Sequence, residues 1–335
     1  MKIEALNKMI EEGYVKVNKH PMADLWIYNY SETAQFERVW NEVTLQCRGL
    51  ILDKNGEVVA RPFPKFFNLE ELENTTIPNL PFEVYEKMDG SLGISYAIDQ
   101  EIFIATRGSF TSEQSVKANE LLNTKYAAAK AKMNPAITYL FEIIYPANRI
   151  VLDYGDREEL VLLGMIHTAT REELPLADIG FPTVKKYDGL NELQQLKALA
   201  LDNKEGFVVK FANNFRLKVK FEEYIRIHRL VTQVSTINIW ENLMNHQPLD
   251  ELLERVPDEF YHWVKATVAK LEKEYQIIED IAKNEYQVLA TRKETALYFQ
   301  KCTYPKILFS MLDGKDYAKT IWRYIRPIYE RPFTG

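Results

Sequence analysis

Short apolar runs follow one another from about residue 24 to residue 225 of the chain. Turn-forming residues separate them, as in Asp53-Lys-Asn-Gly56 and Asn213-Asn214. Runs of this length that contain β-branched and aromatic residues predict strands. The strands that we expect are LWIYNY, GLILD, EVVARPF, SLGISYAI, EIFIATRG, TYLFEIIY, LVLLGMIH, GFVVKF and FRLKVKF.

Helical patterns interrupt these strands and then replace them. Thr111-Ser-Glu-Gln114 is a capping signal for a helix that runs on to Pro135, and a second helical piece is expected from Asn191 to Leu201. After about residue 226 the alternation stops, and residues 265–301 contain few helix breakers. We therefore predict an α+β fold. Residues 1–230 form a domain of antiparallel sheets flanked by helices, and residues 231–335 form an all-α domain.

Composition narrows the class of protein. The chain has 335 residues, of which 46% are hydrophobic and 27% charged, as expected for a folded globular protein. It contains no run of 18 apolar residues, and its first fifteen residues resemble an amphipathic helix rather than a secretory signal. Cys47 and Cys302 lie far apart, which argues against a disulfide framework and a zinc site. We expect a cytoplasmic protein that does not enter a membrane.

The net charge of -6 does not indicate a nucleic-acid partner, but phosphate contacts need only a local basic groove. One segment is rich in such residues, although a solvated charged surface is the other interpretation. Its basic residues are Lys204, Lys210, Arg216, Lys218, Lys220, Arg226, His228 and Arg229.

A lysine in a tight loop is the first candidate for chemistry. Lys87 ends the run FEVYE, and Asp89, Gly90 and Ser91 lead directly into the next strand. A lysine followed by Asp and Gly at these spacings also occurs in ordinary surface turns. Its position between two strands favours function, because glycine lets a phosphate approach the backbone.

Two further strands carry charged residues where apolar ones are expected. Lys218 and Lys220 are two apart, so they project from the same face of a strand that follows Glu205-Gly206. Glu142 interrupts the apolar run TYLFEIIY. The alternatives are an edge strand protected by lysines and a strand with one solvated face.

Three upstream or intervening loops combine basic residues with glycine or aromatic residues. Arg48 precedes Gly49, Lys65 precedes two phenylalanines of which Phe67 is the second, and Arg107 lies in a Gly/Ser turn. Each is also compatible with an ordinary loop beside core aromatic residues.

The order of these motifs resembles one family. Arg-Gly, KFFNL, KMDGS, RGS, FE, EGFVVK and KVK follow one another as they do in covalent nucleotidyltransferases. The pattern is most similar to that of the T4 RNA ligase 1 family. The local sequences CRG, KFFNL and Asn148 to Leu152 also resemble this family. The resemblance covers about residues 24 to 230. It implies the nucleotidyltransferase (ATP-grasp-like DNA/RNA ligase) fold, with an α-helical domain after it.

The resemblance also implies a reaction. ATP and Mg²⁺ (or Mn²⁺) are the expected cofactors, and RNA with 5′-phosphate and 3′-OH ends, a nicked tRNA among the candidates, is the expected partner. Lys87 is implied as the nucleophile, Glu205 as the metal ligand, and Lys218 and Lys220 as α-phosphate contacts. The implied nucleotide-binding residues are Arg48, Lys65, Phe67, Asp89, Gly90, Arg107, Glu142 and Gly206.

Several alternatives stay open at this point. DNA ligases and capping enzymes carry an OB-fold domain after the KVK element, and residues after 226 show no five-stranded pattern. A non-catalytic RNA-binding protein on the same fold would not need the complete set of lysines and carboxylates. We expect a monomer from a bacterial or phage-infected cell, with a C-terminal domain that selects the RNA.

Overall fold

The computed structural model describes residues 3–73, 76–190, 192–199, 204–222, 224–225, 234–249, 253 and 261–330. The chain divides into two compact units, Met1–His228 and Arg229–Gly335. The predicted domain boundary at residue 230 lies outside the described residues, as do Arg226, His228 and Arg229 of the basic segment.

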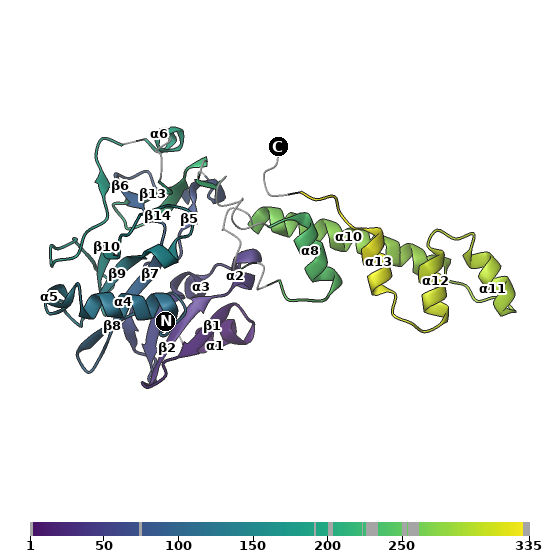
Figure 1. Cartoon of the computed structure of the whole chain (residues 1–335), viewed down its shortest axis with the longest axis horizontal. Helices are drawn as coiled ribbons and strands as arrows, with labels where there is room; N and C mark the ends of the chain where they lie inside the picture. The colour runs from purple at the N-terminus through teal and green to yellow at the C-terminus, as the bar shows by residue number, and fades with distance from the viewer. Residues whose placement is uncertain are drawn as a thin grey trace. The chain divides into compact units, whose positions relative to one another are not determined.

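The first sheet of the first unit holds the strands nearest the N-terminus (Figure 1). Its antiparallel order β1-β2-β3-β4 joins Val15–Lys19, Leu25–Tyr30, Arg48–Asp53 and Val58–Ala60. Helix α1, Ile3–Glu11, buries Leu6 and Met9 in a cluster that also contains residues of this sheet. Two short helices, α2 (Glu32–Phe36) and α3 (Glu42–Gln46), connect β2 to β3.

The second sheet is antiparallel and is covered by helix α4. Its order β11-β10-β9-β7-β8 joins Glu173–Leu174, Glu159–His167, Ile137–Ile144, Ser91–Ile98 and Glu101–Thr106. Helix α4, Glu113–Asn123, lies against β8, β10 and β7, and α5 covers Ala127–Lys130 (Figure 1). Leu121 and Leu122 of α4 pack into the same core as Phe141 of β9.

The third sheet carries the three lysines predicted to be catalytic. Its order β12-β6-β13-β14-β5 joins Lys186–Tyr187, Phe82–Lys87, Gly206–Phe211, Arg216–Lys220 and Phe67–Asn68. Strand β5 pairs parallel with β14, and the other neighbours are antiparallel. Leu217 and Val219 face an apolar core on one side, so the alternation of β14 turns its basic residues to the other side.

One carboxylate joins the second and third sheets. Glu173 on β11 accepts two hydrogen bonds from the Arg216 guanidinium of β14, and its Oε2 lies 3.0 Å from Lys210 Nζ. The Arg216 guanidinium stacks 3.8 Å from the centre of the Phe63 ring. These contacts hold the two sheets together on the side of β14 that carries the basic residues.

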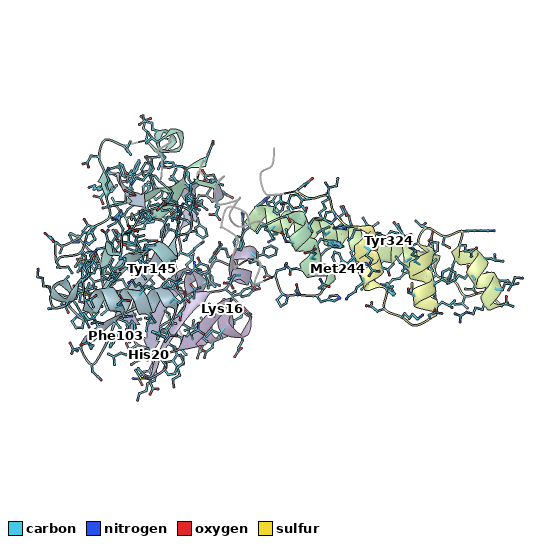
Figure 2. The ribbon with its side chains drawn as sticks, in the orientation of Figure 1. Lys16, His20, Phe103, Tyr145, Met244 and Tyr324 are labelled. Carbon is cyan, nitrogen blue, oxygen red and sulfur yellow. The ribbon has the colours of Figure 1, made fainter. Side chains whose placement is uncertain are left out.

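The second unit is helical in the residues that are described. Its helices are α8 (Thr236–Met244), α10 (Tyr261–Glu285), α11 (Arg292–Phe299), α12 (Pro305–Leu312) and α13 (Ala318–Tyr324). Trp240 Nε1 donates to the Trp322 carbonyl oxygen at 2.8 Å, and the Trp322 ring packs on Tyr275. Trp322 is therefore a core residue, whereas Tyr324 is exposed (Figure 2).

The predicted α+β fold class is confirmed, with differences in the extents of elements. The long helix expected at 111–135 is broken after Asn123 into α4 and α5. The helical stretch at 265–301 is also divided, because α10 ends at Glu285 and α11 begins after its N-cap residue Thr291, which forms a capping box with Glu294. Strand EVVARPF is shortened to β4 because Pro62 and Pro64 cannot donate to a ladder. Helix α6 covers Leu193–Ala198, and Asn191 and Leu201, the predicted ends, lie outside the described residues. None of the described helices is long and apolar enough to span a membrane.

Candidate active site

Lys87, Glu205 and Lys220 meet at one corner of the third sheet. Strand register places Gly206 of β13 opposite both Lys87 of β6 and Lys220 of β14. Lys87 Nζ lies 2.7 Å from Glu205 Oε1, and Lys220 Nζ lies 3.3 Å from the same oxygen. A buried carboxylate therefore sits between two ammonium groups that come from different strands.

Glycine at position 206 is a steric requirement of this corner. Its φ is +151°, and a Cβ atom added there would lie 2.0 Å from the Val219 carbonyl oxygen of β14. A residue with a side chain would push β13 away from β14. The unusual backbone at Gly206 also departs from regular strand alternation, and Glu205 contacts lysines on both neighbouring strands.

The loop after Lys87 is organised by the buried carboxylate of Asp89. Its Oδ2 accepts from the backbone N–H groups of Val151 and Leu152 at 2.9 and 2.8 Å, and its Oδ1 accepts from the Tyr224 hydroxyl at 2.8 Å. The Asp89 N–H donates to the Tyr154 hydroxyl at 2.9 Å. Asp89 therefore holds the loop against two distant segments.

Glu142 lies against the same loop from strand β9. Its Oε1 accepts from the Gly90 N–H at 2.9 Å, and a Cβ atom at Gly90 would lie 2.7 Å from the Ile143 carbonyl oxygen. Removal from water raises the pKa of Glu142 to about 7, against the opposing effect of the Lys87 ammonium. The group titrates close to neutrality in the protein without ligands.

Lys218 and Arg48 approach one aromatic ring from different strands. The Arg48 guanidinium lies 5.2 Å and the Lys218 ammonium 6.0 Å from the centre of the Phe66 ring. Lys218 is also paired in register with Asn68 of β5. Phe66 is thus the phenylalanine beside these two predicted phosphate contacts, and sequence reasoning had singled out Phe67.

Three aromatic rings surround the Lys65 ammonium. Its Nζ lies 5.2, 5.3 and 5.4 Å from the centres of the Tyr30, Trp40 and Phe67 rings. Trp40 packs edge-on against both other rings. Arg107 reaches the same group, because its Nη1 donates to the Tyr30 hydroxyl at 3.3 Å. Lys65 itself is buried.

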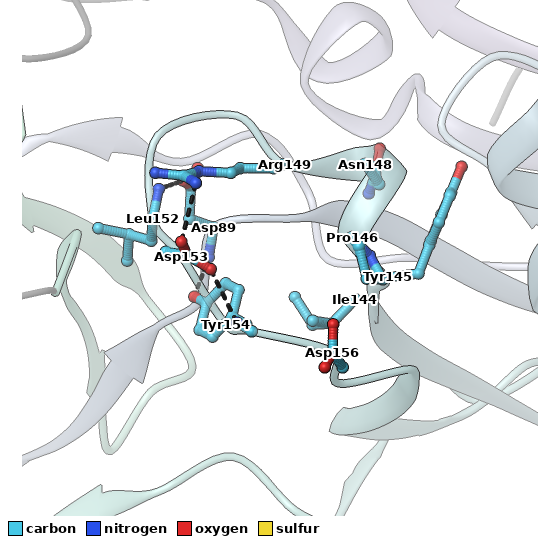
Figure 3. A pocket seen from close by; sticks show the side chains of 11 residues that line it. Asp89, Ile144, Tyr145, Pro146, Asn148, Arg149, Leu152, Asp153, Tyr154 and Asp156 are labelled. Atoms are coloured by element: carbon cyan, nitrogen blue, oxygen red, sulfur yellow. Dashed lines mark hydrogen bonds and ion pairs between the residues drawn. The ribbon is translucent and has the colours of Figure 1, made fainter.

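A cavity of about 310 Å³ opens beside the Asp89 loop (Figure 3). Ile144, Tyr145 and Leu152 supply apolar walls, while Arg149 and Asp153 form an ion pair at 2.8 Å. Asp89 lines this cavity, whereas Lys87 and Glu205 do not, so the cavity lies on the side of the loop that faces residues 144–156. Its walls combine apolar surface with hydrogen-bonding groups, as small-molecule sites do.

A divalent metal ion fits one atom of this site. Glu205 Oε2 is buried and has no hydrogen-bond partner among the described residues. No group of three or more potential His, Cys, Asp or Glu ligands occurs in the described part of the chain. A single carboxylate suits Mg²⁺ or Mn²⁺ ions, which take their other ligands from water and substrate phosphates, and does not by itself form a cage of the Cys and His type that holds zinc.

The predicted residues gather in two neighbouring groups and a loop. Lys87, Glu205, Gly206 and Lys220 form the first group, Lys65, Phe67 and Arg107 the second, and Asp89, Gly90 and Glu142 the loop. Tyr30, Trp40, Phe66, Asn148 and Tyr224 were not predicted. Phe66 and Asn148 lie inside quoted motifs, and Asn148 Nδ2 donates to the Ser91 Oγ at 3.1 Å. Nothing in the local sequence marks Tyr30, Trp40 or Tyr224.

The chain is similar in sequence to known RNA ligases. Residues 46–225 match the sequence model of an RNA ligase family, that of T4 RNA ligase 1. A protein of Autographa californica nuclear polyhedrosis virus, named as a bifunctional polynucleotide kinase/RNA ligase, is 29% identical over 75% of this chain and 40% of its own length. A protein of Thermovibrio ammonificans, named as an RNA ligase, is 28% identical over 70% of this chain and 66% of its own length.

Among solved structures, an RNA ligase mutant of Naegleria gruberi with AMP and Mn is 19% identical over 51% of this chain and 60% of that one, with a TM-score of 0.42. The alignment to the viral relative thus spans well under half of that protein, and the alignment to the bacterial one about two thirds of it. The family model covers more than half of the present chain, and all twelve predicted site residues lie within the matched residues. The chain belongs to the T4 RNA ligase 1 family of RNA ligases.

Proposed function

We propose that this protein is an ATP-dependent RNA ligase that joins a 5′-phosphate to a 3′-OH. The observation that carries the proposal is the corner in which Lys87 lies 2.7 Å from Glu205 beside Lys220. It brings a nucleophile, a metal-binding carboxylate and a phosphate-binding cation together from three separate segments of the chain. Membership of an RNA ligase family supports the same activity.

The reaction requires three transfers. The Lys87 amine, once it has lost a proton, attacks the α-phosphorus of ATP, and the P–O bond to pyrophosphate breaks. The 5′-phosphate of the RNA then attacks the phosphorus of the lysyl-AMP, and Lys87 leaves. Finally the 3′-OH attacks the activated 5′-phosphate, a phosphodiester bond forms, and AMP leaves.

The corner supplies what the first transfer needs. A free lysine is protonated at neutral pH, so its proton must move before attack. Glu205 Oε1 already accepts from the Lys87 ammonium and lies where it can guide that proton away. Lys218 and Lys220 would contact the α-phosphate and offset its growing charge. A Mg²⁺ ion held by Glu205 Oε2 would add positive charge to the same phosphate.

The remaining predicted residues have roles in binding. Glu142 would accept from the ribose hydroxyls of ATP, since its carboxylate faces the loop that carries Lys87. Arg48, Lys65 and Arg107 would bind the outgoing pyrophosphate or the RNA 5′-phosphate. The aromatic rings beside them add apolar surface for a base or ribose.

The helical unit would determine which RNA is joined. Its exposed residues include Lys315, Lys319, Arg323, Tyr324 and Arg326, which are types that meet phosphates and unpaired bases. Trp322 is buried and is not available for such contacts. A nicked tRNA in RNA repair is the substrate that we propose, for a monomeric enzyme in the cytoplasm.

A covalent labelling experiment tests the activity. Incubation with α-³²P-ATP and Mg²⁺ should label the wild-type protein, and Lys87→Ala should remove the label. Lys8→Ala is the matched control, because Lys8 forms only an exposed ion pair with Glu12 on α1. Labelled protein from Lys87→Ala would assign the nucleophile elsewhere, and an unlabelled wild type would favour the non-catalytic RNA-binding alternative.

The same gel separates related enzymes. Labelling by α-³²P-GTP in place of ATP would indicate a capping-type enzyme. Sealing of a nicked DNA duplex in preference to a nicked RNA stem-loop would indicate a DNA ligase. The described residues after 225 contain helices and no strand, which supports the RNA ligase over both alternatives.

A further inference from the structure

A buried carboxylate that the reaction does not use lies directly beside Lys87. Glu86 is 7% exposed and occupies the face of β6 opposite to Lys87. Strand register places it beside Phe207, whose side chain is fully buried in an apolar cluster. A charge in such a position is unfavourable unless it is well paired.

The partner of Glu86 is the residue that precedes Glu205. Lys204 Nζ donates to Glu86 Oε1, and the Tyr187 hydroxyl lies 3.5 Å from Glu86 Oε2. The Glu86 N–H donates to the Lys185 carbonyl oxygen at 2.9 Å, which ties β6 to the strand on its other side. Both Glu86 and its surroundings are therefore fixed by strands β6, β12 and β13.

Two ion pairs thus join the same two dipeptides, and the acidic residue comes from β6 in one pair and from the segment before β13 in the other. Glu86-Lys87 of β6 faces Lys204-Glu205, with Glu86 bound to Lys204 and Lys87 bound to Glu205. One pair lies on the apolar face of the sheet and the other at the active corner. Lys204 and Glu205 both precede β13, so the two pairs fix the segment that leads into this strand and extend its attachment to β6 beyond the ladder.

The backbone at this point needs such a constraint. Gly206, which follows Glu205, has a φ of +151° and no side chain to restrict it. Glu205 lies just before the first residue of β13, so ladder hydrogen bonds fix it only from one side. The Glu86–Lys204 pair holds the chain on the other side of Glu205.

We propose that Glu86 and Lys204 are positioning residues that hold the Glu205 carboxylate against Lys87. The arrangement is independent of any ligand, and only its effect on adenylation rests on the proposed function. Without the pair, Glu205 moves away from Lys87, and Lys87 becomes more reactive toward general acylating reagents and less reactive toward ATP.

The test replaces the pair by apolar residues of similar size. In E86L/K204M no buried charge is left alone, so the midpoint of thermal unfolding should stay near that of the wild type. Acetylation of Lys87 by an N-hydroxysuccinimide ester, without nucleotide or metal, is followed by mass spectrometry with exposed Lys54 as internal reference. We expect the relative rate to rise about three-fold or more, because the carboxylate that lies 2.7 Å from the Lys87 nitrogen and covers it has moved.

A matched control uses another cross-strand ion pair of β6. Glu83 and Lys186 pair at 2.7 Å between β6 and β12, away from Lys87, so E83L/K186M should leave both acetylation of Lys87 and adenylation unchanged. Adenylation by E86L/K204M should fall about ten-fold or more. Should E86L/K204M fail to fold, E86Q/K204Q, which keeps a neutral hydrogen bond, is judged by the same acetylation rate.

The outcomes are distinct. Acetylation of Lys87 at the wild-type rate in a folded variant would overturn the inference, whatever the ligase activity. A faster acetylation in a protein whose wild type forms no nucleotide adduct would support the positioning role and refute the proposed function. Faster acetylation together with slower adenylation would support both.

Discussion

Two buried carboxylates of the active region have opposite surroundings. Asp89 receives three hydrogen bonds from the protein, two from backbone N–H groups and one from the Tyr224 hydroxyl. Glu205 receives both of its ion pairs on Oε1, and its Oε2 has no partner among the described residues. The first carboxylate is saturated and the second is half saturated, although both are more than nine-tenths buried.

The difference in hydrogen bonding indicates which of the two carboxylates stabilises the loop and which can bind a ligand. A carboxylate whose two oxygens are both hydrogen-bonded by the protein can stabilise a loop and has little capacity left for a ligand. A carboxylate with a free buried oxygen is unfavourable until a cation or donor binds there. We therefore propose that Asp89 belongs to the framework of the site and Glu205 to its reactive part.

The largest effect that the comparison predicts is on stability. Asp89→Ala leaves two buried N–H groups and one hydroxyl without an acceptor, and should lower the free energy of unfolding by about 4 kcal/mol. Urea denaturation measures this. The control is Asp153→Ala, which removes an exposed ion pair with Arg149 and an exposed hydrogen bond from the Gly155 N–H, and should change stability by less than about 1 kcal/mol. Equal losses in the two variants would show that the Asp89 bonds do not organise the loop.

The second prediction is a large effect on adenylation with a small effect on stability. Glu205→Gln should leave the free energy of unfolding within about 1 kcal/mol of the wild-type value, because Oε2 accepts no hydrogen bond from the described residues and the amide oxygen can still accept from Lys87. Adenylation should fall about 100-fold or more, since the amide binds a divalent cation poorly. Single-turnover labelling by α-³²P-ATP gives the rate. A loss of stability as large as that of Asp89→Ala would place Glu205 in the framework as well.

The third prediction concerns Glu142, whose carboxylate accepts one hydrogen bond from the loop. The pKa of Glu142 is raised from 4.5 to about 7, so the folded protein binds its proton more tightly than the unfolded chain does. The resulting penalty on stability is absent below pH 4.5, grows between pH 4.5 and 7, and is complete above that range. Glu142→Gln keeps an acceptor for the Gly90 N–H and should therefore stabilise the protein by about 2 kcal/mol at pH 8.

Thermal or urea unfolding at two pH values decides the matter. The stabilisation by Glu142→Gln should vanish at pH 4.5, where the wild-type residue is already largely protonated in the fold. A gain of the same size at both pH values would come from packing and not from the charge of Glu142.

The smallest effect is expected at Tyr224. Tyr224→Phe removes one hydrogen bond to Asp89 and should lower the free energy of unfolding by about 1 kcal/mol. In the Asp89→Ala background the same substitution should have no further effect, because the bond is already lost. Additive losses in this double-mutant cycle would mean that Tyr224 stabilises the fold through other contacts.

The sequence predicted those parts of the site that depend on local pattern. Lys218 and Lys220 share the basic face of β14, because strand periodicity alone determines that result. Lys87 was expected in the loop between two strands and is instead the last residue of β6, so that the loop begins at the next residue. The register that brings Gly206 opposite Lys87 and Lys220 was not predictable. It depends on pairing between segments more than a hundred residues apart.

Other features depend on contacts that no local signal reveals. Tyr224 reaches Asp89 across 135 positions, and Trp40 follows a short helix, α2, that begins at the capping residue Ser31. Helices of five residues contain too few turns for periodicity to indicate them. Trp322 lies among basic residues in the sequence and is nevertheless buried, because one buried position per turn is normal in an amphipathic helix such as α13.

The two cysteines of the chain differ in exposure, which allows one of them to be labelled selectively. Cys47 is fully buried beneath the first sheet, and burial raises the pKa of its thiol to about 12. Cys302 is partly exposed at the end of α11. Thiolates, and not thiols, react with maleimides, so a fluorescent maleimide should attach at Cys302 in the native protein without any substitution. A single dye in the helical unit would then report RNA binding by its anisotropy, while the nucleotide-binding unit stays chemically untouched.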